Sequence, residues 1–174
     1  MIDQATNFIQ RHYKNFTSMS WVYSCGAGAN YGTALESALK IGETIHIPSC
    51  CYEIEEYIHG PNLQLTPQYN VIFFDGNDGA SRRVEQVYKA TRKVSNRAYL
   101  ISNNPQLSSD DHVLSLSDTV SSELCPLVYL PFVQLLSFII SDDLHSIYQH
   151  PLLKEFKAIA AAKTENFVNY DGDD

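Results

Sequence analysis

The apolar and polar positions of the chain alternate between helical and extended patterns. Residues 3–16 carry apolar side chains at helical spacing, which predicts an amphipathic helix. Short β-prone apolar runs predict five strands, at 21–25, 45–50, 71–74, 98–102 and 112–116. Between and after them, helical patterns predict helices at 32–43, 51–58, 80–95, 123–140 and 152–163.

Strands that alternate with helices are typical of a parallel sheet covered on both faces. The run VIFF at 71–74 suits a strand buried on both faces. We therefore predict an α/β fold, a three-layer α/β/α sandwich around a mainly parallel sheet of about five strands. Residues 1–174 show no internal repeat and no linker, so we expect one domain, with a disordered acidic tail at 168–174.

The most apolar stretch, residues 124–140, is interrupted by Pro126, Pro131 and Gln134. It is shorter than the roughly 20 residues that a membrane-spanning helix needs, so we expect a buried core helix and no membrane. Charged residues run through the first sixteen positions, which argues against a signal peptide.

Composition narrows the class of protein. Hydrophobic residues make up 44% of the chain and charged residues 18%, as in soluble globular proteins. A net charge of −8 argues against nucleic acid as a partner, because phosphate contacts need a basic face. The four cysteines lack CxxC spacing and the histidines lack HxH or HExxH spacing, so we expect no metal site. We also expect a reduced cytoplasmic protein.

The glycine-rich segment GAGANYG, residues 26–32, follows the first predicted strand. Ligands of parallel sheets bind at the carboxyl ends of the strands, where this segment would lie. Its GxGxxxG spacing differs from the dinucleotide fingerprint. We therefore expect Gly28, Asn30 and Tyr31 either to contact a small ligand or merely to pack the following helix on the sheet.

Glu36, Lys40 and Glu43 stand at i, i+4 and i+7 and share one face of the predicted helix. As a surface feature, Glu36 and Lys40 form an exposed ion pair in its favourable orientation. As a functional feature, Glu43 beside a lysine is placed to act as a general base. The remaining apolar positions of this segment are expected to face the core: Leu35, Ala38 and Leu39.

Two further segments carry candidate chemistry. His59 precedes Gly60-Pro61, where its imidazole either caps a helix end or sits on a rigid loop and transfers protons. The segment DGNDGAS stands where a phosphate-binding loop is expected, but Asp75 and Asp78 have the wrong charge for an anion. Only Ser81 of this loop is suited to bond a phosphate.

Three segments together resemble a known family, the sugar isomerase (SIS) domains. They are CGAGANYGTALESALKIGET at 25–44, YEIEEYIHGP at 52–61 and CPLVYLPFVQLL at 125–136. The similarity is to the C-terminal SIS half of double-SIS enzymes, such as the isomerase part of glucosamine-6-phosphate synthase and the fructosamine-6-phosphate deglycases. EEYIHGPNLQLTP at 55–67 favours the deglycase branch. The resemblance implies the same flavodoxin-like sandwich.

The resemblance also implies roles for individual residues. Glu43 matches the glutamate that moves a proton between C1 and C2 of the sugar. His59 matches a histidine that assists ring opening or proton transfer and comes from the neighbouring subunit. Glu36 and Lys40 match positions that line the same pocket. No cofactor is implied, because an aldose–ketose proton shift needs only a positioned base and acid.

The family's C-terminal lysine has no clear counterpart. Lys154 and Lys157 follow the pair at 150–151 at the corresponding place, but the local pattern differs, so the sequence assigns no Schiff-base lysine.

The implied function is that of a phosphosugar isomerase or fructosamine-6-phosphate deglycase acting on a ketose or ketosamine 6-phosphate. In double-SIS enzymes, the first half carries the serine- and threonine-rich loops that bind the phosphate. We therefore expect a sugar phosphate ligand and a homodimer or a complementary SIS half. The alternative is a non-catalytic phosphosugar-binding or assembly module. A sensor domain is disfavoured, because the short ends leave little room for a DNA-binding module.

Overall fold

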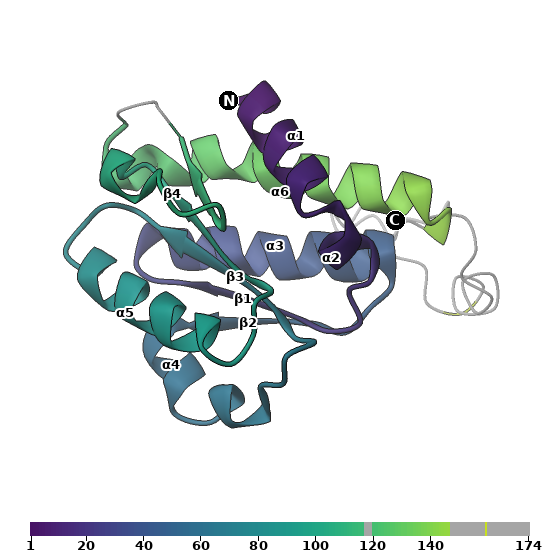
Figure 1. Cartoon of the computed structure of the whole chain (residues 1–174), viewed down its shortest axis with the longest axis horizontal. Coiled ribbons are helices and arrows are strands. Elements are labelled where there is room, and N and C mark those ends of the chain that lie inside the picture. Colours follow the sequence, from purple (N-terminus) through teal and green to yellow (C-terminus); the bar gives the residue numbers. More distant parts are fainter. Residues whose placement is uncertain (117–119, 147–158, 160–174) are drawn as a thin grey trace, which may run out of the picture.

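The computed structural model describes residues 1–116, 120–146 and 159. Its centre is a five-stranded sheet, all of whose pairings are parallel, in the order β2-β1-β3-β4-β5 (Figure 1). The strands are β1 (Val22–Gly26), β2 (Ser49–Glu53), β3 (Asn70–Asp75), β4 (Ala98–Ser102) and β5 (Val113–Ser115). This confirms the predicted α/β sandwich with about five parallel strands.

Helices cover both faces of the sheet (Figure 1). The longer helices are α1 (Ile2–Arg11), α2 (Tyr13–Thr17), α3 (Ala29–Ile45), α4 (Ile54–Ile58), α5 (Ser81–Arg92) and α6 (Cys125–Asp143). Short 3₁₀ turns are Pro61–Gln64, Pro105–Leu107 and Ser122–Leu124. Helices α1, α3 and α6 pack on one face, and α4 and α5 pack on the other.

The alternation of side chains along the strands builds two hydrophobic cores. In β3, Ile72 and Phe74 contribute to the core with α1, α3 and α6, whereas Val71 and Phe73 contribute to the core with α4 and α5. All four side chains are fully buried, as expected for residues 71–74. The two cores separate the helices into two layers, and this separation decides which candidate residues can meet.

The second strand was predicted too early in the sequence. Helix α3 continues to Ile45 and ends where His46 adopts a left-handed φ of 63°. The strand then runs over Ser49–Glu53, paired with β1, instead of 45–50. Its extent also shortens the helix predicted at 51–58, because Glu53 caps α4 and accepts a hydrogen bond from the N–H of Glu55 at 2.6 Å.

The single helix predicted over 3–16 is two helices, α1 and α2, which meet at His12. The predicted helix at 152–163 and the acidic tail at 168–174 lie outside the described residues, apart from Ile159.

Within the described residues, one helical stretch, Ser122–Asp143, is long and apolar enough to cross a membrane by length and composition. Half of its apolar window is buried in the fold, against the core that α1 and α3 share with it. A core helix of a soluble protein passes the same test, and the burial agrees with the core helix predicted at 123–140.

Candidate active site on helix α3 and the loop after α4

The loop between β1 and α3 brings the start of α3 close to the carboxyl end of the sheet. Gly28 adopts φ of 54°, a conformation that side chains rarely accept. A Cβ on Gly26 would lie 2.3 Å from the carbonyl oxygen of Asn30, so only glycine fits there. Strand order reverses between β1 and β3, which makes this loop part of the crevice where ligands of such sheets bind.

The three ligand candidates of this loop differ in exposure. Gly28 is exposed and Tyr31 is partly exposed. Asn30 is fully buried, and its Oδ1 accepts a hydrogen bond from the Thr33 hydroxyl at 3.1 Å. Asn30 therefore braces the first turn of α3, which favours the packing interpretation for this residue.

Glu36, Lys40 and Glu43 form one charged constellation on the outer face of α3. The Lys40 ammonium nitrogen lies 3.7 Å from a carboxylate oxygen of Glu36 and 2.5 Å from one of Glu43. The three side chains are between 32% and 45% exposed, so a ligand can reach them from solvent. The hydrogen bond to Glu43 is the main cause that raises the pKa of Lys40 above its ordinary value. The lysine is thus cationic at neutral pH.

The expected burial of Leu35 and Leu39 is wrong. These side chains are 49% and 58% exposed. Helix α3 packs instead through a stripe of smaller and β-branched residues that includes Ala34, Ala38 and Ile41. Small side chains let α3 approach the sheet and α6 closely. With this stripe turned inward, both leucines lie on the outer face of α3 with the charged constellation.

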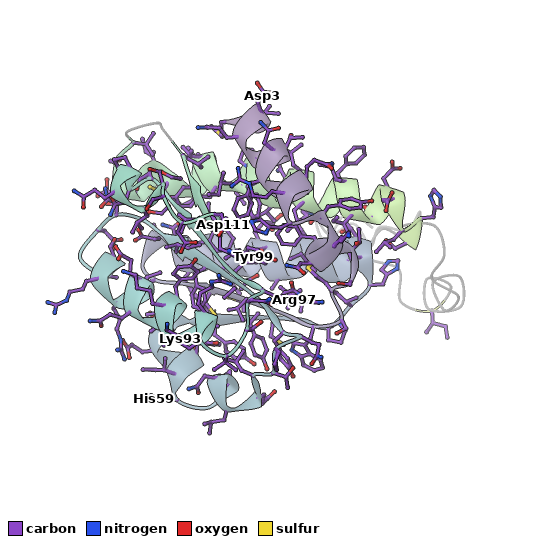
Figure 2. The ribbon with its side chains drawn as sticks, viewed as in Figure 1. Asp3, His59, Lys93, Arg97, Tyr99 and Asp111 are labelled. Carbon is purple, nitrogen blue, oxygen red and sulfur yellow. The ribbon has the colours of Figure 1, made fainter. Side chains whose placement is uncertain are left out.

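His59 lies on the opposite side of the sheet from α3. It lies at the end of α4 and is exposed (Figure 2). Its backbone N–H donates to the carbonyl of Glu56 at 3.1 Å. An ion pair between Arg83 and Glu55, with Nε 2.7 Å from Oε1, ties α4 to α5. Because α4 belongs to the second layer, one chain does not bring His59 to the α3 constellation.

A pocket of about 310 Å³ lies between α4 and α5, at the lower end of the size range of ligand pockets, and His59 does not line it. Ile58, Leu65 and Val87 are among its lining residues. The largely apolar lining does not suit a charged sugar phosphate, and we assign no ligand to it.

The loop after β3 is organised around Asp75, which is fully buried. Its carboxylate accepts hydrogen bonds from the hydroxyls of Ser81 and Ser102, the latter at 2.7 Å, and from the N–H of Asn77 at 3.1 Å. The Tyr129 hydroxyl donates to the carbonyl of the same residue at 2.6 Å. This network was not predicted.

Ser81, the one residue of this loop that was expected to bond a phosphate, is already engaged. Its hydroxyl donates to Asp75 and accepts the N–H of Asp78 at 2.7 Å. Asp78 itself is exposed and carries a negative charge. The loop therefore lacks the donors and the field that would hold a phosphate.

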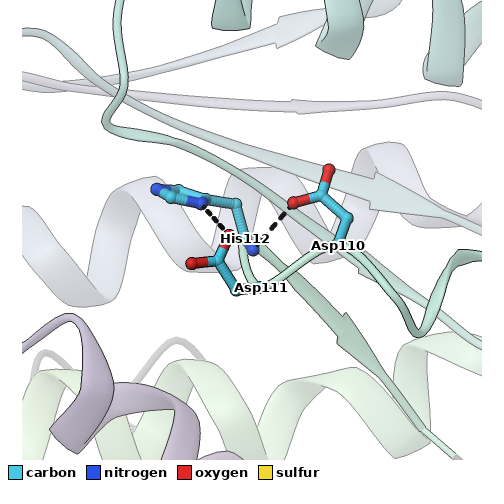
Figure 3. A group of neighbouring side chains, drawn as sticks. All are labelled: Asp110, Asp111 and His112. Carbon is cyan, nitrogen blue, oxygen red and sulfur yellow. Dashed lines mark hydrogen bonds and ion pairs between the residues drawn. The ribbon is translucent and has the colours of Figure 1, made fainter.

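Among the described residues, Asp110, Asp111 and His112 bring three possible metal ligands within 4.8 Å of one another (Figure 3). The His112 ring nitrogen Nδ1 is 2.7 Å from a carboxylate oxygen of Asp111. Asp110 accepts from the backbone N–H of His112 at 3.0 Å and from the Tyr88 hydroxyl at 2.8 Å. Groups of exposed acidic side chains are common without an ion, so this cluster alone assigns no metal.

Sequence comparison finds similarity to several bacterial proteins that carry one name. No protein-family model matches the sequence. A glutamine–fructose-6-phosphate aminotransferase (isomerizing) of Wigglesworthia glossinidia brevipalpis is 25% identical over 147 residues, which is 83% of this chain and 24% of that protein. The enzyme of the same name from Xylella fastidiosa (strain Temecula1) is 27% identical over 71% of this chain and 20% of its own length. The chain thus spans about a fifth to a quarter of these relatives.

Solved structures share the fold. A Clostridium difficile 630 protein described as a phosphosugar isomerase superposes with a TM-score of 0.79 at 20% identity, covering 93% of this chain and 45% of that one. The C-terminal domain of glucosamine-fructose-6-phosphate aminotransferase from Francisella tularensis gives 0.68 at 22% identity, with coverages of 80% and 40%. The chain therefore has the fold of sugar isomerase (SIS) domains, as the sequence resemblance implied.

Proposed function

We propose that the chain supplies the acid–base residues of a phosphosugar isomerase or fructosamine-6-phosphate deglycase. The observation that carries this proposal is the Glu36–Lys40–Glu43 constellation, accessible to solvent on α3 of an SIS fold. The sequence relatives, named as isomerizing fructose-6-phosphate aminotransferases, support a ketose or ketosamine 6-phosphate as substrate.

In the proposed reaction, Glu43 is the general base. Its carboxylate takes a proton from one of the carbons C1 and C2 of the open-chain sugar and returns it to the other. The ammonium of Lys40 lies 2.5 Å from this carboxylate. His59 protonates the ring oxygen as the ring opens, or the leaving amine in a deglycase.

This mechanism needs a second chain, because His59 and Glu43 lie on opposite layers of one sheet. The outer faces of α3 and α6, which pack on each other, expose large apolar side chains. These are Leu35, Leu39, Leu127 and Phe138, between 49% and 68% exposed. Such a surface is typical of a protein interface.

We propose a homodimer through this face of α3 and α6. Because His59 of each copy lies on the opposite layer, a symmetric contact of this face does not itself bring a partner's His59 to Glu43, and the histidine has to come from a further copy or from a complementary SIS half. The chain covers 40% to 45% of the solved chains that it matches, so a partner of similar size is expected. A complementary SIS half is the other candidate. It is favoured by the loop at 75–81, whose one suitable hydroxyl is occupied, since a second half could supply the phosphate contacts.

The interface predicts that Leu39→Asp weakens association, because a carboxylate would be buried without a partner at the centre of an apolar contact. Sedimentation or light scattering across a dilution series should show a wild-type dimer and a monomeric variant. The matched control is Leu63→Asp, at an 86% exposed leucine in the turn after α4. A wild-type chain that is monomeric at all concentrations would remove the homodimer and leave the complementary half.

Ligand binding is tested by thermal unfolding with fructose 6-phosphate and a fructosamine 6-phosphate. At 100 times the dissociation constant, a ligand should stabilise the protein by about 2.7 kcal/mol. For this size, the melting temperature should rise by roughly 5–10 °C. Fructose and inorganic phosphate are the controls, each lacking half of the ligand. If none of the sugar phosphates shifts the melting temperature, the chain alone does not form the site.

A non-catalytic phosphosugar-binding or assembly module is the second candidate function. The loop at 75–81, which lacks a phosphate cradle, argues against catalysis by this chain alone. Such a binding module predicts a melting shift with sugar phosphates but no turnover, whereas the catalytic proposal requires both.

A further inference from the structure

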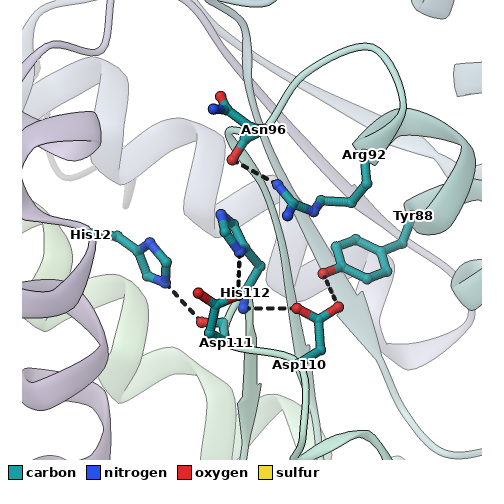
Figure 4. Close-up of polar contacts among 7 residues, drawn as sticks. All are labelled: His12, Tyr88, Arg92, Asn96, Asp110, Asp111 and His112. Atoms are coloured by element: carbon teal, nitrogen blue, oxygen red, sulfur yellow. Dashed lines mark hydrogen bonds and ion pairs between the residues drawn. The ribbon is translucent and has the colours of Figure 1, made fainter.

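His12, at the junction of α1 and α2, connects the N-terminal helices to the segment that precedes β5. Its side chain is buried, with 7% of the residue exposed. Its ring nitrogen Nε2 lies 2.8 Å from the backbone oxygen of Asp111, just before β5 (Figure 4). The N-terminal helices are thus held by this hydrogen bond and by the apolar packing of Phe8 and Ile9 in the core.

A second histidine stands against the first. The ring centroids of His12 and His112 are 4.6 Å apart, and His112 stacks on Tyr99 at 5.5 Å with an interplanar angle of 16°. The Nδ1 atom of His112 meets the Asp111 carboxylate at 2.7 Å (Figure 4). Two imidazoles from segments far apart in the sequence thus share one aromatic pocket.

The hydrogen bonds define the protonation states that fit this arrangement. A carbonyl only accepts, so Nε2 of His12 carries the proton that it donates to Asp111. A second proton would have to sit on Nδ1 of an imidazole whose ring neighbours are Phe8, Phe16 and Tyr99. Charging a ring in such surroundings is unfavourable because the charge loses its hydration.

The neighbouring charges act in both directions. The carboxylate of Asp111 favours a protonated His12, whereas His112 and Arg11 oppose it. The pKa of Asp111 is lowered, mainly by its hydrogen bond with His112 and also by the charge of Arg92 on α5. The carboxylate of Asp110 accepts a hydrogen bond from the Tyr88 hydroxyl. Burial outweighs the other contributions and lowers the pKa of His12 below its ordinary value of 6.5.

We propose that His12, Asp111 and His112 form an acid-sensitive latch that holds the α1–α2 pair on the sheet at neutral pH and loosens it on acidification. Near neutral pH the His12 ring is uncharged and packed. As the pH falls, the unfolded or undocked segment takes up a proton on His12 before the docked one does. The docking free energy is therefore complete above pH 6.5 and declines as the pH falls below that value.

The latch would regulate access to apolar surface. Undocking α1 removes Ala5, Phe8 and Ile9 from the core that they share with α6. That would uncover Phe132, which Phe8 contacts with ring centroids 6.0 Å apart. Mild acidification would then expose the apolar surface of α6 around Phe132 without unfolding the parallel sheet.

Hydrogen exchange measures this docking directly. Protection factors, corrected for intrinsic exchange, are compared for α1 and for α5 as internal reference, at about pH 7.5 and about pH 5.5. The protection of α1 relative to α5 should fall at the lower pH, by no more than about tenfold, because pH 5.5 lies one unit below the ordinary His12 pKa of 6.5. Equal relative protection at the two pH values would overturn the proposal.

The variant His12→Gln keeps an N–H donor but does not titrate, so its α1 protection should lose the pH dependence. His59→Gln, which removes an exposed imidazole on the other layer, should retain it. Should His12→Gln not fold, His112→Gln replaces it: loss of the neighbouring imidazole raises the pKa of His12 and should shrink the pH dependence. An NMR titration of the wild-type imidazoles in which His12 titrates at or above 6.5 would also refute the latch.

Discussion

Replacing Glu43 by glutamine is expected to lower the turnover of a sugar 6-phosphate by about 10²- to 10⁴-fold, the usual contribution of a general base. Glutamine has nearly the same shape and still accepts a hydrogen bond from Lys40, but it cannot take up a proton at neutral pH. The melting temperature should change little, since Glu43 is 45% exposed and its ion pair contributes little stability. Turnover is measured in the assembly in which the wild-type chain is active.

The matched control is Glu85→Gln. Glu85 also pairs with a lysine of its own helix, with Lys89 Nζ 3.0 Å from its carboxylate, but it lies on α5. This substitution should leave turnover unchanged. Wild-type turnover in Glu43→Gln would end the catalytic assignment, and absence of turnover in the wild type with a bound sugar phosphate would favour the non-catalytic module.

Replacing Asp75 by alanine should destabilise the fold by about 3 kcal/mol or more, because hydrogen bonds to a charged group are worth about 1.5–3 kcal/mol each. Three groups donate to this buried carboxylate, from Ser81, Ser102 and Asn77. Two of them are hydroxyls on buried serines that would lose their acceptor. Urea denaturation, read as the change in midpoint at constant slope, measures the loss.

The neighbouring acidic residue provides the comparison. Asp78 is exposed, and its side chain accepts a hydrogen bond from the N–H of Ala80 at 2.8 Å. Asp78→Ala should therefore cost about 1 kcal/mol or less, as for the loss of one local cap. A loss of less than about 1 kcal/mol in Asp75→Ala would show that the serine hydroxyls find other partners.

The sheet was predictable because its signal is local. Each strand of a parallel sheet is a short apolar run between polar turns, and VIFF within β3 could be assigned from four residues. The β2 boundary was not predictable from local sequence, because strand-forming residues stand on both sides of it, Ile45 and Ile47 before and Tyr52 after. Pairing with β1, and the capping of α4 by Glu53, decide where β2 lies.

The charged face of α3 followed from helical spacing alone, since Glu36, Lys40 and Glu43 must share a side wherever the helix lies. Spacing does not say which apolar face packs inward when both are apolar, and the leucines at 35 and 39 were therefore misplaced. The separation of His59 from Glu43 depends on which layer each helix joins, a property of the whole topology. Ser102 and Tyr129 could not be linked to Asp75 from the sequence, because the three are brought together only by the folded sheet.

The interlocked side chains around Asp75 bear on how this loop can change in descent. A phosphate-binding sequence at residues 75–81 would require the replacement of Asp75. That replacement would leave the hydroxyls of Ser81 and Ser102 without their hydrogen-bond acceptor. Residues that satisfy one another in this way are not replaced independently, so each single step passes through a less stable protein. Proteins that carry this loop are therefore expected to keep it during evolution. We expect them to gain anion binding more readily by association with another domain than by changing residues 75–81.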